Sequence, residues 1–133
     1  MKRLLYAAGL FTALVFSINA QTSTASAEVP FNFRMGQSIM PAGRYVIQAS
    51  GALLTVREVS GTRKSAVKLT LPASRASVSS QPKLEFHRYG SDYFLAAVWR
   101  QDSHEGRALP TTKFEKELIS HAQLLQTASI SLH

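Results

Sequence analysis

The stretch that most constrains the fold is residues 83–100, KLEFHRYGSDYFLAAVWR, which predicts a β-hairpin. Side chains alternate along a strand, so Leu84 and Phe86 share one face of the first arm while His87 lies on the other. Gly-Ser-Asp supplies the turn, because glycine accepts a positive φ and aspartate can bond its local backbone. The second arm, residues 93–99, is apolar on both faces, which is typical of a strand covered on both sides. We therefore expect this arm at the centre of a sheet.

Further segments of period two flank the hairpin at intervals of about ten residues, which is typical of an antiparallel sandwich or open barrel. Residues 66–71 show the clearest alternation, so we expect Val67, Leu69 and Leu71 to point inward. Lys68 and Thr70 fall on the opposite face and are expected to point outward. The other segments are residues 29–33, 44–49, 52–58 and 128–132.

The connections contain one helical pattern. Thr112 and Glu115 match a capping box, in which the hydroxyl and the carboxylate each satisfy a free helical N–H. Phe114 and Leu118 then fall on one face at helical spacing, which predicts a short amphipathic helix ending near Gln123. The predicted fold class is mainly β: a small antiparallel β-sandwich or open barrel with one short C-terminal amphipathic helix. Loops are expected at residues 35–41, 72–82 and 101–110, with a short strand at 76–79 inside the second of them.

The N-terminus predicts a secretory signal peptide. Lys2 and Arg3 form a short positive region, and residues 4–18 form an apolar run shorter than the roughly 20 residues of a spanning helix. Cleavage after Ala20 and cleavage after Ala27 both fit the pattern of small residues. The alternative is an uncleaved membrane anchor.

The predicted signal peptide divides the chain into two regions. Residues 1–27 are expected to be the signal peptide with a short polar linker, and residues 28–133 a single β-rich domain. The domain is expected in the periplasm or the extracellular space, with the membrane contacted only through the signal peptide. The chain has no cysteine, so disulfides, thiolate metal ligands and cysteine nucleophiles are excluded.

The net charge limits the kinds of partner that the protein is expected to bind. The chain carries a formal net charge of +7, and the 15 basic residues less Lys2 and Arg3 leave 13 against 8 acidic ones, a balance near +5. A basic exported protein meets anionic envelope polymers or lipid head groups before it meets nucleic acid, and the densest basic group lacks the interleaved aromatic residues of a nucleic-acid site. We therefore expect an anionic envelope polymer or a protein partner and no nucleic acid. The densest basic group is Arg57, Arg63, Lys64 and Lys68.

Catalytic patterns are absent from the sequence. Residues 102–105, Asp-Ser-His-Glu, are the densest group of acid–base side chains, but they lie in a predicted loop without the spacing of a catalytic metal site. The sequence contains no nucleophile elbow or glycine-rich phosphate loop. We expect no enzyme, no metal and no cofactor, and an enzyme that uses His104 ranks last among the hypotheses.

Four short elements follow one another in the chain: PFNF, PAGRY, FHRYGSDYFLAAVW and GRALP. Their order resembles a family of small, exported, functionally uncharacterised bacterial proteins with PF-x-F, PAG-x-Y, FHRYG-x-x-YFL-x-x-W and GR-x-LP elements. The resemblance covers most of residues 29–120 and implies export and a compact β-rich domain, without a particular activity. Among the matching positions, the polar side chains of His87, Arg88 and Arg107 are candidates for binding.

The function expected from these observations is that of an exported, non-enzymatic domain that binds or scaffolds another envelope component. The alternative is a carrier that encloses a small apolar ligand between or within its sheets. Arg107 is expected to be structural, bonded to Glu85 or to the carbonyls that close the helix loop. On that hypothesis Arg107→Ala lowers stability and His87→Ala does not.

Overall fold

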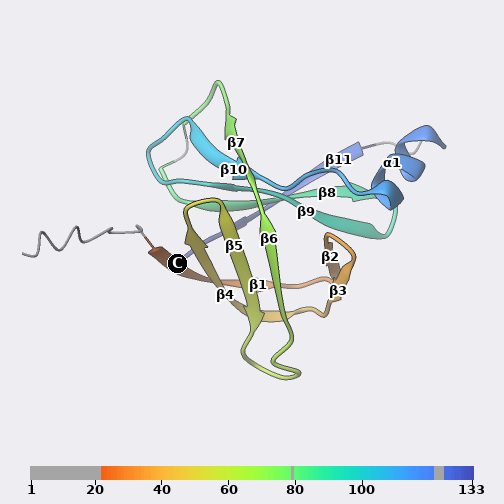
Figure 1. The fold of residues 1–133 in the computed structure, drawn as a ribbon, viewed down its shortest axis with the longest axis horizontal. Helices are drawn as coiled ribbons and strands as arrows, with labels where there is room; N and C mark the ends of the chain where they lie inside the picture. The colour runs from red at the N-terminus through yellow and green to blue at the C-terminus, as the bar shows by residue number, and fades with distance from the viewer. Residues whose placement is uncertain (1–21, 79, 122–124) are drawn as a thin grey trace, which may run out of the picture.

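Two mostly antiparallel β-sheets face each other, and one short helix lies near the C-terminal end of the chain (Figure 1). The computed structural model of the protein describes residues 22–78, 80–121 and 125–133. The strands of the two sheets cross at a steep angle, and the sheets do not form a closed barrel. The predicted fold class is therefore confirmed. Within the described ranges, no helix is long and apolar enough to cross a membrane.

The first sheet, called sheet A, has the strand order β1-β4-β5-β6. The second, called sheet B, has the order β11-β8-β9-β10-β7, with a small hairpin of β2 and β3 beside β9. The helix α1 spans Lys113–Ser120. The strands of sheet A are β1 (Thr22–Val29), β4 (Gly43–Ser50), β5 (Leu53–Glu58) and β6 (Ser65–Leu69). Those of sheet B are β7 (Leu71–Ser74), β8 (Lys83–Tyr89), β9 (Asp92–Trp99), β10 (Glu105–Ala108) and β11 (Leu125–Ser131), with β2 (Phe33–Met35) and β3 (Ser38–Met40).

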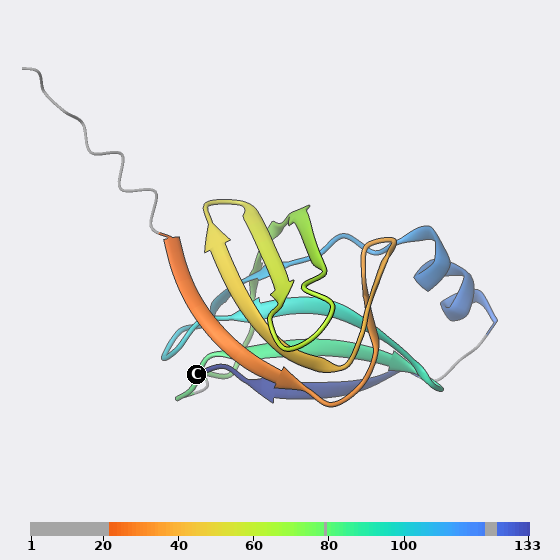
Figure 2. The same ribbon diagram turned by 90° about the horizontal axis from the view of Figure 1, so that it is seen from below.

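Two links join the sheets at their edges. On one side β6 continues through Thr70 into β7, so the chain passes from sheet A to sheet B with a single residue between the strands. On the other side Ser26 of β1 and His133 exchange two backbone hydrogen bonds of 2.9 Å. Figure 2 shows β1 and β11 side by side at this second edge. Switching sheets at a bend is how orthogonally packed sheets turn a corner.

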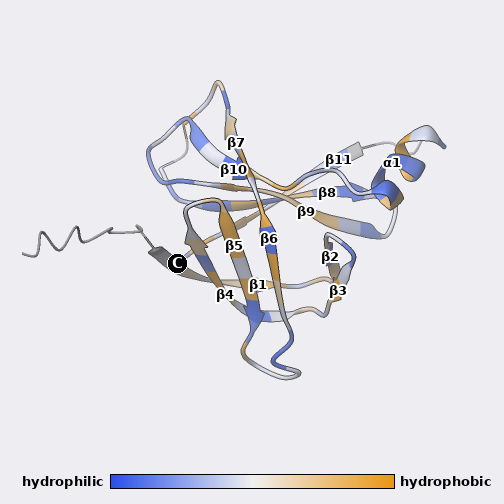
Figure 3. Ribbon diagram, in the orientation of Figure 1, coloured by the Kyte–Doolittle hydropathy of each residue, from blue (hydrophilic) through white to orange (hydrophobic). Residues whose placement is uncertain are grey.

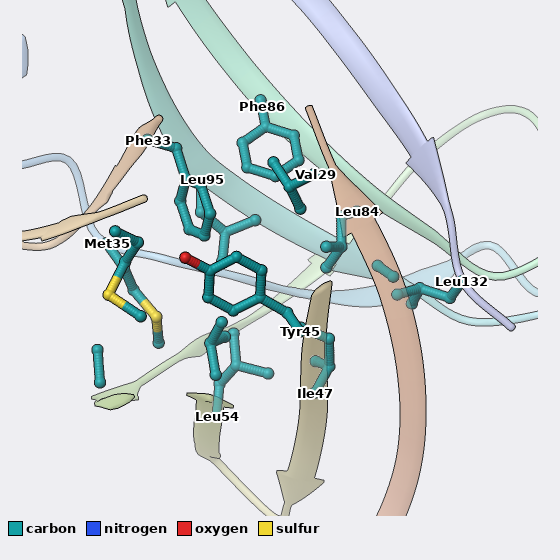
Figure 4. Packing of buried hydrophobic residues seen from close by; sticks show 14 residues of the cluster. Val29, Phe33, Met35, Tyr45, Ile47, Leu54, Leu84, Phe86, Leu95 and Leu132 are labelled. Atoms are coloured by element: carbon teal, nitrogen blue, oxygen red, sulfur yellow. The ribbon is translucent and has the colours of Figure 1, made fainter. Parts of the chain in front are cut away.

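The core fills the space between the sheets with apolar side chains from both of them (Figure 4). Tyr45 of β4 and Phe86 of β8 are fully buried, and Phe33 packs edge-on against both rings at 5.2 Å. The Tyr45 hydroxyl donates to the Pro41 carbonyl, which explains the PAG-x-Y spacing as an anchored turn. Burial, aided by the negative charge of Glu58, raises the pKa of Tyr45 to about 12.

The hairpin predicted at residues 83–100 is present as β8 and β9, and β9 is the central strand of sheet B. Its inner face, with Leu95, belongs to the core, and its outer face carries Phe94 and Trp99. Trp99 is buried on that outer face, where Arg75 lies over its ring at 4.7 Å and Gly106 leaves no room for a Cβ. The expectation of a strand covered on both sides is confirmed.

Several expected boundaries are wrong. Residues 21–27 were expected as linker, but from Thr22 onward they form β1, because they pair with β4, which places Ala27 in the core. Residues 29–33 do not form one strand, since β1 ends at Val29 and β2 begins at Phe33. The expected loops at 35–41, 72–82 and 101–110 contain β3, β7 and β10, and the short strand falls at β7 rather than at 76–79.

The phase of residues 66–71 is the reverse of the prediction. Ala66 and Thr70 are buried, whereas Val67, Leu69 and Leu71 are exposed on the outer side. Thr70 points inward because its hydroxyl and its N–H both donate to the Ala52 carbonyl, at 2.7 and 2.8 Å. Because side chains alternate along a strand, an inward Thr70 places its aliphatic neighbours Leu69 and Leu71 on the outer side.

Candidate functional site

An apolar stripe lies on the outer side of the corner where sheet A passes into sheet B. We call Leu53, Val67, Leu69 and Leu71 the outer stripe; their exposed fractions are 46, 53, 67 and 59%. Leu53 and Leu69 are directly paired across β5 and β6, and Leu71 follows two residues later in β7. Figure 3 shows hydrophobic colour along β5 and β6. A contiguous exposed aliphatic surface of this kind marks an interaction site more often than scattered single residues do.

The edge of β6 beside this stripe is open. The Lys64 carbonyl accepts from the N–H of Glu58 in β5, and the Thr70 N–H donates to the carbonyl of Ala52, the residue before β5, each at 2.8 Å. Hydrogen-bonded and non-hydrogen-bonded pairs alternate in an antiparallel ladder. The intervening odd-numbered residues therefore direct their N–H and C=O groups away from β5, out of the edge of sheet A. These residues are Ser65, Val67 and Leu69.

The basic group predicted from the sequence does not form one patch. Lys64 donates through Nζ to the Ile39 carbonyl at 2.6 Å, and the Lys68 side chain lies across Gly36 of the β2–β3 turn. Both lysines thus hold the β2–β3 hairpin against the end of sheet A, and Lys68 does not point outward as expected. Arg57 remains exposed beside the outer stripe, opposite Ser65.

Arg63 belongs to a loop that is built around a buried carboxylate. Glu58 is buried and accepts hydrogen bonds from the N–H groups of Ser60, Gly61 and Arg63 at 2.8–3.0 Å. The hydroxyls of Ser60 and Thr62 donate to it as well, at 2.6 and 3.1 Å. The hydrogen bond from the Ser60 hydroxyl is the largest of the effects that lower the pKa of Glu58 to about 2. The loop folds on this carboxylate, and Arg63 takes a positive φ of 55° to reach it.

His87 lies under helix α1 on the outer face of sheet B. Its Nδ1 is 3.2 Å from the Glu115 carboxylate, which also accepts from the Tyr89 hydroxyl at 3.1 Å, and its Nε2 is 3.7 Å from Glu85. The hydrogen bond with Glu115 outweighs desolvation and raises the pKa of His87. Burial, and then the Glu115 charge, raises the pKa of Tyr89 to about 12. This cluster docks the helix on the sheet.

The capping box is only half confirmed. Thr112 accepts from the Glu115 N–H at 3.2 Å, but the Glu115 side chain turns to the sheet and is the buried residue of the helix. Phe114, expected on the apolar face, is half exposed; it packs beside Phe94 and under the Arg34 guanidinium. The helix ends at Ser120, and Gln123 lies outside the described residues.

Arg107 and Arg88 have separate local partners. Arg107 donates through Nε to the Thr70 hydroxyl at 2.9 Å and through Nη2 to the Thr70 carbonyl at 2.8 Å. Its expected partners, Glu85 and the carbonyls near the helix, are therefore wrong. Arg88 donates to the Gly90 carbonyl at 2.7 Å and lies over the Tyr93 ring. Arg107 is opposite Val98 in sheet B, so it does not join His87 and Arg88 in one site.

The polar group at residues 102–105 is tied to the strand edges. His104 Nδ1 lies 3.0 Å from the Arg75 carbonyl, and the Arg75 N–H donates to the His104 carbonyl at 2.9 Å. Among the residues that the structure describes, no three His, Asp or Glu side chains gather where they could hold a metal ion.

No family model, curated protein or solved structure matches this chain. The family resemblance of the sequence elements therefore stays a prediction.

Three residues of these sites differ from what the sequence predicts. Glu115 was expected to cap the helix, and no role was predicted for Glu58, although Ser60, Gly61 and Thr62 offer the hydroxyl and N–H donors that bury its carboxylate. Thr70 was placed on the outside of its strand. The local pattern indicates the opposite phase, because Val67, Leu69 and Leu71 form an aliphatic set and Lys68 lies in the other set.

Proposed function

We propose that this protein is an exported, non-enzymatic domain that binds or scaffolds another component of the envelope through its outer stripe. The observation that carries the proposal is the outward phase of Val67, Leu69 and Leu71, which leaves aliphatic surface exposed beside Leu53. Exposing such a surface is unfavourable in water by roughly 25 cal/mol per Å². A covering partner recovers that free energy.

The surroundings of the stripe favour a protein as the bound component. The aliphatic residues lie on a β-sheet face next to an open strand edge, and apolar side chains with an adjacent strand edge are what peptide strands and sheet faces recognise. An anionic polymer would need several cations together. Here Lys64 and Lys68 are engaged at the β2–β3 hairpin, which leaves Arg57 beside the stripe.

The carrier alternative has less support. A ligand between the sheets would have to displace core side chains such as Tyr45, Phe86 and Leu54, which are fully buried in one apolar cluster (Figure 4).

Photo-cross-linking in the exported fraction tests the proposal. A benzophenone side chain placed at Leu69 should give a defined adduct, whereas the same group at Thr24, exposed on the outer face of β1, should not. The Leu69 adduct should disappear when Leu53→Lys is introduced into the same chain, because that change places a charge across the strand pair. Equal adducts at the two positions, or an adduct that survives Leu53→Lys, would overturn the proposal.

A further inference from the structure

The edges of the two sheets differ in how they are protected. β1 and β11 are linked through Ser26 and His133. Just beyond β7, the Arg75 N–H donates to the His104 carbonyl, which precedes β10. Because hydrogen-bonded and outward-facing residues alternate from there, Pro72 of β7 occupies a position whose N–H would otherwise point out of the edge. Charged residues and proline on edge strands are the usual protection against pairing with another chain.

The β6 edge has neither form of protection. Ser65, Val67 and Leu69 direct their backbone groups outward, and their side chains carry no charge. Lys68 is the charge on this strand, and it lies across Gly36 on the inner side. Among the described strands, β6 thus combines an open ladder with exposed aliphatic side chains.

We propose that β6 pairs antiparallel with β6 of a second copy of this chain, about a two-fold axis at Val67. In this register Val67 lies opposite its counterpart, Ser65 opposite Leu69, and Ala66 opposite Lys68. The three outward residues exchange two hydrogen bonds per pair, about six in all. No like charges face each other, so the strand is complementary to itself, as a two-fold interface requires.

The proposal rests on the proposed function and names the scaffold that serves it. Pairing through the edge leaves the outer face of β5 and β6 free, and it brings the outer stripes of two copies side by side on one continuous sheet. The apolar surface offered to an envelope component is thereby doubled.

The size of the contact sets its expected strength. A five-residue strand is about 17 Å long, and such a contact falls below the roughly 1,200 Å² of lasting complexes, which indicates a Kd of about 10 μM to 1 mM. Each copy without its first 20 residues has a charge near +5, from 13 basic and 8 acidic side chains. Salt screens the repulsion between copies, so the dimer should strengthen as ionic strength rises.

Sedimentation equilibrium of the protein purified from the exported fraction tests this inference. The wild type should dimerise in the stated range, more tightly at 0.3 M than at 0.03 M salt. Val67→Lys should be monomeric, because the two lysines would lie directly opposite. Thr24→Lys adds the same charge on β1 and should dimerise like the wild type. Val67→Lys mixed with Val67→Glu should form a heterodimer, provided both melt as cooperatively as the wild type.

Two results would overturn the proposal: a wild type that stays monomeric at 1 mM, or a Val67→Lys variant that dimerises as tightly as Thr24→Lys. Either result leaves the proposed function standing if the Leu69 cross-link to another protein still depends on Leu53. Loss of that dependence with an intact β6 dimer would overturn the proposed function alone.

Discussion

Removing the Arg107 guanidinium should destabilise the corner where β6 passes into β7. Arg107 holds both the hydroxyl and the carbonyl of Thr70, and Thr70 is in turn bonded to Ala52. Hydrogen bonds to charged groups contribute about 1.5–3 kcal/mol each. Because Arg107 is half-buried and Thr70 can regain some water contact, we expect Arg107→Ala to lower the free energy of unfolding by about 2 kcal/mol in total.

Urea unfolding followed by Trp99 fluorescence measures this loss. With a slope of about 1.5 kcal/mol per M for a domain of this size, the midpoint should fall by about 1 M. Arg107→Met keeps the apolar stem and should lose nearly as much, which separates the hydrogen bonds from packing. Arg57→Ala, on the exposed face of β5, is the matched control and should change the midpoint little. If the urea midpoint of Arg107→Ala equals that of Arg57→Ala, the hydrogen bonds from Arg107 to Thr70 do not stabilise the corner, and the prediction is refuted.

Three further predictions concern titration and processing. The raised pKa of His87 means that its contact with Glu115 stabilises the fold below about pH 6.5 and that this stabilisation is lost as the pH rises through the raised value. An NMR titration giving a His87 pKa at or below 6.5 would contradict this. His87→Ala should lower the free energy of unfolding at pH 6, which differs from the expectation from sequence. The Glu58 carboxylate has a pKa of about 2 in the fold against 4.5 in the unfolded chain, so its ionised form stabilises the fold above pH 4.5. That stabilisation is lost as the pH falls toward 2. A Glu58→Gln variant that unfolds in acid at the same pH as the wild type would contradict this prediction. The exported protein should begin at Gln21 by mass spectrometry, because cleavage after Ala27 would remove most of β1; a product beginning at Glu28 would contradict it.

The sequence predicts the parts of the fold where pattern and burial coincide. In β9 both faces are apolar and both are covered, and in β4 the inward set that includes Tyr45 and Ile47 is the apolar one. An alternating pattern shows that a segment forms a strand, but it does not show which of the two faces is buried. In β6 the phase depends on Thr70, whose bonds to Ala52 come from a distant part of the chain.

The candidate site was hidden from the sequence for the same reason. Val67, Leu69 and Leu71 have the composition of a core face, so their exposure follows only from the crossover between sheets. Likewise, β1 is built from small residues whose propensity for strands is modest. Its pairing with β4 along all eight residues supplies what the local sequence lacks.

Thiol labelling tests the outward phase of β6 most directly, and both proposals depend on that phase. The chain has no cysteine, so Leu69→Cys and Thr70→Cys each introduce a single thiol. With a maleimide reagent at pH 7, the thiol at Leu69 should react nearly as fast in the folded protein as in the unfolded protein. The thiol at Thr70 should be strongly protected until the protein unfolds. Protection at Leu69 with rapid reaction at Thr70 would contradict the structure of this corner and both proposals built on it.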